Sequence, residues 1–190
     1  MTLQTPQPPP SALRAVLGAL DSETALRQPA AAALRRPAGT LVPAHPLAVH
    51  VLDGPRPELP AARRTGWRFL IKDGADVAAA AEVVQAVEGH TFSHFTAGPY
   101  LDSTVRALRE AWQLAQSSRI RRQPRLLTFP GQYATALWLH SPDTGPAGDL
   151  LIPLAPAPLG VTAHRAYPAA ELLPLLARAP LARPLLLGTS

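Results

Sequence analysis

Residues 66–73 read GWRFLIKD, and this stretch decides how the middle of the chain is expected to fold. Its large apolar side chains, Trp67, Phe69 and Ile71, stand at every second position. That period is typical of a β-strand with one buried face. Asp73 and the glycine after it have the composition of a tight turn. The stretch therefore predicts a half-buried strand that ends in a turn.

The segment after this turn has the pattern of a helix. Residues 75–88 are rich in Ala and Val, and apolar residues recur at every third or fourth position from Val77 to Val87, which is the spacing of one helical face. Gly89 stands where a helix commonly ends. Residues 90–96, rich in Thr and Phe, predict a second strand. A helical connection between the two strands is long enough for a parallel crossover.

Residues 100–118 are the clearest helix in the sequence. Pro99 precedes them, where a first-turn proline is favoured. An apolar stripe runs along one side at helical spacing, formed by Leu101, Val105, Leu108, Trp112 and Ala115. A stripe of this width faces the core, so we expect Trp112 to be buried.

Further strands are expected in the last third of the chain. Residues 125–129 and 132–140 are apolar and are joined by a Pro-Gly pair, which indicates a turn between antiparallel strands. Residues 148–154 predict another strand, and residues 169–179 a short helix. The fold class that follows is α+β (or α/β): a single domain with a mixed sheet, two main helices packed on it, and Pro-rich flanking segments.

Proline placement sets the expected domain organisation. Residues 1–65 and 124–190 contain 11 prolines each, whereas residues 66–123 contain one. Because proline interrupts helices and interior strands, continuous helices and strands are expected mainly in the middle of the chain, which should form the stable core. The predicted units are a Pro/Ala-rich N-terminal extension with short helices at 1–45, one mixed α/β domain at 46–180 whose firmest part is 66–140, and a C-terminal tail at 181–190. Residues 1–10, with four prolines, are expected to be disordered.

The composition excludes several classes of protein. The 190 residues include no cysteine, so disulfide scaffolds and cysteine zinc sites are excluded. No apolar run reaches about 18 residues, which argues against a transmembrane helix. No secretory signal is evident at the start, so a cytoplasmic location is the default expectation. One lysine stands against 17 arginines in a chain rich in Ala and Pro, which indicates a GC-rich, bacterium-like coding background.

Motifs for catalysis and metal binding are absent or incomplete. The sequence has no Walker-type loop, no GxGxxG and no GxSxG nucleophile elbow. His90 and His94 are the best candidates for a metal pair, but they need further ligands from elsewhere in the chain. The neighbours His140, Ser141 and Asp143 do not by themselves make a catalytic triad. We therefore predict no catalytic residue, no metal site and no cofactor.

The strongest binding feature follows the long helix. Four arginines and no acidic residue stand within residues 117–125. We predict that nucleic acid or another anion is contacted by Arg119, Arg121, Arg122 and Arg125, because arginine can neutralise a phosphate. Aromatic residues would add stacking surfaces if the sheet face is open: Trp67, Phe69, Phe92 and Phe95. The alternative is a solvated loop, with the aromatic residues in the core.

These observations favour a non-enzymatic binding protein whose basic loop contacts nucleic acid (DNA or RNA) or another anionic partner, such as an acidic protein. The first alternative is a protein–protein assembly or accessory module, homo-oligomers included, because sheet edges and Pro-rich ends can serve as docking sites. The second alternative is a small enzyme without a recognisable motif. No membrane partner is expected, because the long helix carries charges of both signs on its polar face.

Overall fold

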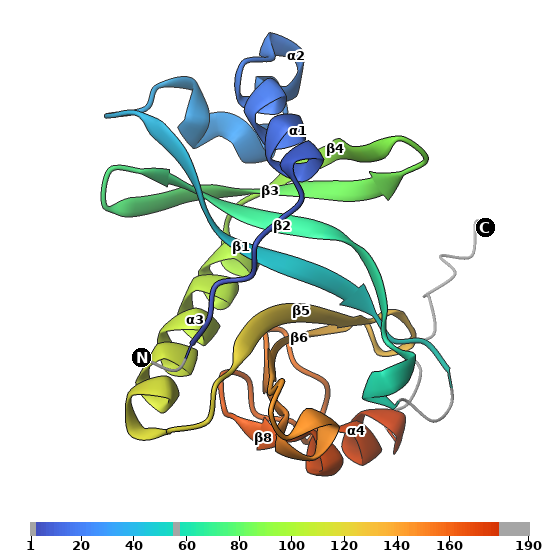
Figure 1. The fold of residues 1–190 in the computed structure, drawn as a ribbon. Helices are drawn as coiled ribbons and strands as arrows, with labels where there is room; N and C mark the ends of the chain where they lie inside the picture. The colour runs from blue at the N-terminus through green and yellow to red at the C-terminus, as the bar shows by residue number, and fades with distance from the viewer. Residues whose placement is uncertain (1–2, 55–57, 179–190) are drawn as a thin grey trace, which may run out of the picture.

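One mixed β-sheet organises the computed structural model, which describes residues 3–54 and 58–178. Its eight strands lie in the order β4-β3-β2-β1-β5-β6-β7-β8 (Figure 1). The strands are β1 (Leu41–Val51), β2 (Arg63–Asp73), β3 (Asp76–Ala86), β4 (Gly89–Thr96), β5 (Gln123–Phe129), β6 (Ala134–His140), β7 (Leu150–Pro153) and β8 (Tyr167–Pro168). Neighbours pair antiparallel except β1 and β5, which are parallel. The predicted mixed sheet of an α+β fold is confirmed.

Four α-helices pack around this sheet in the described residues. They are α1 (Pro10–Leu20), α2 (Glu23–Leu26), α3 (Pro99–Ser117) and α4 (Ala169–Arg178), and the longest 3-10 segment is η1 (Pro29–Arg35). α1 and η1 pack on one face near β3 and β4, α4 packs on the same face near β7 and β8, and α3 packs on the opposite face (Figure 1). The expectation of two main helices is therefore wrong.

Strand β3 occupies the segment that the sequence predicted as a helix. Ala79, Ala80 and Ala81 are each 1% exposed or less, because α1 and η1 lie over one face of this strand and α3 over the other. A strand that is buried on both faces loses the polar–apolar alternation by which strands are identified. Its valines stand at helical spacing only by coincidence.

Strands β1 to β4 form an antiparallel meander, so the predicted crossover between 66–73 and 90–96 is also wrong. Gly74, with φ of 61°, makes the tight turn between β2 and β3. Helix α3 then carries the chain back across the sheet, and β5 enters beside β1. Residues 48–51 pair in parallel with residues 125–128.

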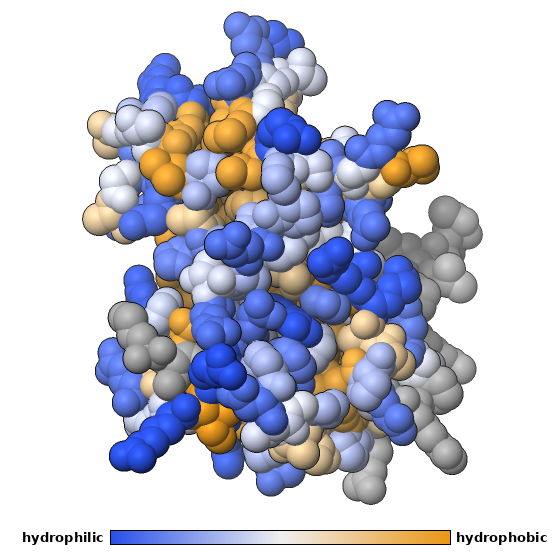
Figure 2. All heavy atoms as spheres, in the orientation of Figure 1, coloured by the Kyte–Doolittle hydropathy of each residue, from blue (hydrophilic) through white to orange (hydrophobic). Residues whose placement is uncertain are grey.

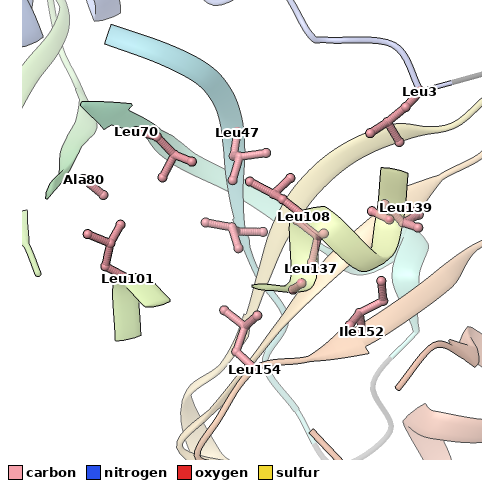
Figure 3. Close-up of a cluster of buried hydrophobic side chains, with 13 residues drawn as sticks. Leu3, Leu47, Leu70, Ala80, Leu101, Leu108, Leu137, Leu139, Ile152 and Leu154 are labelled. Atoms are coloured by element: carbon pink, nitrogen blue, oxygen red, sulfur yellow. The ribbon is translucent and has the colours of Figure 1, made fainter. Parts of the chain in front are cut away.

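The hydrophobic core has three parts. The first lies between α3 and the sheet and includes Leu70, Leu108 and Leu137 (Figure 3). The second, around Trp67, lies between the sheet and α1 with η1. The third lies between α4 and strands β5 to β7. Trp112 packs at the edge of the first part and is half-buried rather than fully buried.

The N-terminal segment contacts the sheet, which contradicts the predicted disorder for residues 3–10. Leu3 is 8% exposed and belongs to the core under α3. The backbone amide of Gln4 donates to the carbonyl of Arg122 at 2.8 Å. From there the segment crosses the strands to α1, which begins at Pro10 (Figure 1).

Two predicted features lie wholly or partly outside the described residues. Residues 1–2 of the expected disordered start and the whole of the tail at 181–190 belong to this group. The division into an extension at 1–45 and a domain at 46–180 stays a prediction. Within residues 3–54 and 58–178, no helix has both the length and the hydrophobicity that a membrane crossing requires.

The core under α3 yields a stability prediction. Leu137→Ala is expected to lower the free energy of unfolding by about 2–5 kcal/mol, because Leu137 is fully buried at 0% exposure. Leu17→Ala is the matched control: Leu17 is 44% exposed on α1 and should lose about 0.5 kcal/mol or less. Urea unfolding of both variants measures the difference, and equal losses would contradict this description of the core.

Candidate anion-binding groove

A groove of about 460 Å³ opens on the sheet face that carries α1 and α4. It lies over strands β2, β1 and β5, between the two hydrophobic clusters of that face. Its lining includes His50, Arg64, Trp67, Gln85, Gln123 and Arg125, together with Pro6 and Gln7 of the N-terminal segment. Figure 2 shows this face, with hydrophilic side chains across its middle and a hydrophobic patch near α1.

A row of cross-strand partners forms the floor of the groove. Trp67 of β2 pairs with Ala48 of β1, and Ala48 pairs in turn with Arg125 of β5. Arg125 pairs with Trp138 of β6. Side chains at directly opposed positions share one face of the sheet. The hollow forms at Ala48 because this small residue stands between Trp67 and Arg125.

A β-bulge in β2 brings Arg64 into the groove. Val49 pairs with Gly66 and His50 pairs with Arg64, so one residue of β2 has no partner between them. The extra residue interrupts the alternation of side chains along the strand, so Arg64 and Trp67, three positions apart, line the same groove. A Cβ on Gly66 would lie 2.0 Å from a carbonyl oxygen of β3, so this close approach of the two backbones requires glycine.

Two arginines give the groove its positive charge. The Cζ of Arg125 lies 4.9 Å from the centre of the Trp138 ring, and its Nε and Nη2 donate to Oε1 of Gln123 at 3.2 and 2.9 Å. Arg64 is exposed, with its Cζ 5.9 Å from the centre of the Trp67 ring. The described lining residues include no Asp or Glu. Two guanidinium groups in a lining that contains no acidic side chain form a site that attracts phosphate or carboxylate ligands.

Asp149 is a buried carboxylate that supports the groove from behind Trp138. It is 1% exposed and accepts hydrogen bonds from Nε1 of Trp138 and from a backbone amide, both at 2.7 Å. His140 Nδ1 lies 3.2 Å from the same carboxylate. Burial lowers the pKa of Arg125, and the negative charge of Asp149 opposes this effect. Asp149 thus fixes the indole on which Arg125 lies.

His50 adds polarity to the groove without adding charge at neutral pH. It is 8% exposed, and its ring lies 5.2 Å from the Trp138 ring in an edge-on arrangement. Burial, followed by the charges of Arg125 and Arg64, lowers the pKa of His50 from 6.5 to about 4. Its neutral imidazole donates through Nδ1 to the backbone carbonyl of Ala48 at 3.3 Å, which leaves Nε2 as a hydrogen-bond acceptor.

Trp67 holds a donor that the described residues do not use. It is 3% exposed, and its Nε1 has no hydrogen-bond partner among the described residues. A buried N–H group without a partner is destabilising by about 1–3 kcal/mol. Although the Trp67 ring lines the groove, its Nε1 atom is itself buried and is not presented to a ligand there.

The four arginines predicted from the sequence lie in different environments. Arg125 is part of strand β5 and lines the groove. Arg119 is exposed in the connection after α3. Arg121 donates through Nε to Asp143 at 3.0 Å, and this hydrogen bond holds the pKa of the Asp143 carboxyl below its ordinary value. Arg122 is half-buried and donates to a serine hydroxyl at 3.3 Å.

The aromatic residues considered for stacking belong largely to the core. Trp67 and Phe95 are 3% exposed, and Phe69 is 2% exposed. Phe92 is half-buried, with its ring centre 4.7 Å from that of Phe95. The part of the sheet that carries Phe69, Phe92 and Phe95 is therefore covered by helices, whereas Trp67 lies at the edge of this covered part, beside the groove.

The candidate metal and catalytic residues have separate partners. His90 Nδ1 lies 2.9 Å from a serine hydroxyl of α1, and His94 Nδ1 lies 3.0 Å from the hydroxyl of its neighbour Ser93. His140 contacts Asp149 rather than Asp143. Within the described ranges, no group of three or more His, Asp or Glu side chains is placed to hold a metal ion.

The sequence did not point to His50, Arg64, Gln85 or Gln123. These residues come from four strands, and only the pairing of those strands brings them together. One signal was present in the sequence. His50 and Arg125 stand two positions from apolar residues that face the core, so they are polar residues at inward-facing positions.

Comparison with known proteins finds no relative: no protein-family model matches the chain, and no curated protein or solved structure matches it. The function must therefore be inferred from the groove itself.

The low pKa of His50 predicts a pH dependence of stability. The folded pKa of about 4 lies below the ordinary 6.5, so the stabilising contribution is complete above about pH 6.5 and is lost as the pH falls toward 4. Between pH 7 and 4.5, the wild type should lose about 2 kcal/mol more than His50→Gln. Urea unfolding at both pH values tests this expectation. The control His94→Gln, at an exposed histidine, should lose as much unfolding free energy as the wild type. Equal losses in the wild type and in His50→Gln would contradict the prediction.

Proposed function

We propose that the protein is a non-enzymatic binding protein that takes the phosphate backbone of a single-stranded nucleic acid into the groove between α1 and α4. The observation that carries this proposal is that Arg64 and Arg125 line one groove whose described lining contains no acidic side chain. Each arginine that contacts a phosphate adds to affinity and to salt dependence. Gln85 and Gln123 supply amide groups of the kind that hydrogen-bond to bases.

The basic run after α3, which is formed by the four arginines of residues 117–125, contributes less to this proposal than the groove does. Arg119 is exposed and has no ion pair or hydrogen bond among the described residues, so it is available to extend the contact beyond the groove. Arg121 is held by Asp143, and a phosphate would have to compete with that carboxylate. Arg125 thus links the basic run to the groove.

Protein–protein assembly is the second candidate. Leu13 and Leu17 are 38% and 44% exposed and stand one helical turn apart on α1. Strand β4 forms one edge of the sheet, and an unpaired edge can accept a further strand. Sedimentation of the protein alone at low and high salt tests this candidate, because a salt-resistant oligomer is its expected result.

A binding titration tests the nucleic-acid proposal. We expect a fluorescently labelled, mixed-sequence DNA single strand to bind the wild type, with affinity falling between about 50 and 200 mM salt. The double variant Arg64→Gln with Arg125→Gln should bind more weakly. Its slope of log affinity against log salt should be smaller by about 0.7 for each phosphate that the substituted side chains no longer neutralise.

Two matched variants locate the binding site. Arg35→Gln with Arg36→Gln removes the same charge at exposed positions next to η1, and it should leave the slope unchanged. Arg119→Gln with Arg121→Gln tests the connection after α3. Two results would reject the groove as the site. In the first, the Arg35/Arg36 variant weakens binding as much as the Arg64/Arg125 variant does. In the second, the Arg119/Arg121 variant lowers the slope and the Arg64/Arg125 variant does not. If the wild type does not bind at about 50 mM salt, nucleic acid is rejected as the ligand.

A further inference from the structure

A second hollow lies on the opposite face of the sheet, under α3. It has a volume of about 190 Å³ and opens beside the end of β2. Leu70 of β2 and Leu108 of α3 form its floor, and they are 1% and 6% exposed. Val105 and Trp112 of α3 add apolar walls. An apolar cavity of about 150 Å³ can bind benzene, so this hollow suits one aromatic ring or a short alkyl chain.

The rim of this hollow is cationic. Lys72 and Arg109 both line it, and neither has an ion pair or hydrogen bond among the described residues. None of the described lining residues is acidic. Asp73, which follows Lys72 in sequence, is turned to other partners: its carboxylate accepts the backbone amides of Ala38 and Gly39, each at 2.7 Å. A ligand carboxylate at the rim would therefore meet two cations without a competing internal anion.

His45 completes the rim from strand β1. The register of β1 against β2 shifts between Ala44 and Leu47, and His45 has a left-handed backbone with φ of 45°. A residue other than glycine is uncommon in this region of backbone conformation. The irregular backbone places His45 among the residues that line the hollow. Burial, with a further effect of Lys72, lowers the pKa of His45, so a neutral imidazole is available there for hydrogen bonding.

We propose that this hollow, formed by β1, β2 and α3, binds a small amphipathic anion: an aromatic or short alkyl carboxylate. The apolar part packs on Leu70 and Leu108, and the carboxylate lies between Lys72 and Arg109. This site is independent of the groove, because it lies on the other face of the sheet and shares none of the groove's described lining residues.

Calorimetric titration with benzoate tests the proposal. We expect saturable binding to the wild type, with a Kd on the order of 1 mM. Benzyl alcohol has the same ring without the charge and should bind at least about tenfold more weakly, because hydrogen bonds to charged groups are the stronger ones. Benzoate should also change the fluorescence of the wild type, and Trp112→Phe should remove this change while the heat of binding persists.

Matched variants of the rim decide the outcome. Lys72→Gln and Arg109→Gln should each weaken benzoate binding by about tenfold. Arg106→Gln removes an exposed charge from the same helix, outside the hollow, and should bind as the wild type does. Arg64→Gln with Arg125→Gln should also leave benzoate binding unchanged, so this test can succeed or fail separately from that of the groove. The proposal is overturned if benzoate shows no saturation by about 20 mM, if benzyl alcohol binds equally well, or if Arg106→Gln weakens binding as much as the rim variants.

Discussion

The parallel pairing of β1 with β5 is the interaction on which the rest of this structure depends. In the sheet it is the contact that joins the meander β1 to β4 with the antiparallel strands β5 to β8. The same pairing places Ala48 beside Arg125 and thereby forms the floor of the groove. Helix α3 makes it feasible, because its 19 residues carry the chain from β4, at the edge of the sheet, back across the sheet to the start of β5. The core and the candidate binding surface thus have one structural origin.

Local patterns predict the elements whose large apolar residues recur at a regular spacing. Strand β2 has Trp67, Phe69 and Ile71 at every second position, although Leu70 is buried on its other face. Helix α3 has a continuous apolar stripe. Strand β3 is covered on both faces, and its alanines carry no periodic signal that distinguishes a buried strand from a helix. The groove is harder still to predict. Arg64 enters it through a bulge, and Arg125 enters it through pairing with a strand far away in the sequence, which no local pattern encodes.

Polar side chains at inward-facing positions explain why α1 and α4 stay apart on one face of the sheet. His50, Gln85 and Arg125 lie on the strand faces whose other residues form the two clusters under these helices. A helix packed over them would remove their polar groups from water, which is unfavourable unless every group finds a partner. Arg125 has partial compensation from the Trp138 ring and Gln123. The groove is therefore a consequence of the side-chain pattern of the central strands.

The positions of the ion pairs explain why the groove and the hollow under α3 are both cationic. In the described residues, the ion pairs among Arg, Asp and Glu are Arg27–Glu23, Arg63–Asp53, Arg68–Glu82 and Arg121–Asp143. None of these residues lines the groove or the hollow under α3. The cations that do line them, Arg64 and Arg125 in one case and Lys72 and Arg109 in the other, form no ion pair with a carboxylate of the described residues, although the charge of Asp149 acts on Arg125. A cation that forms no ion pair within the protein attracts an external anion. In Arg125 the hydrogen bonds to Gln123 occupy Nε and Nη2, and Nη1 remains available for such a ligand. The difference between the openings is then set by their walls: glutamine side chains line the groove, whereas leucine and valine side chains line the hollow.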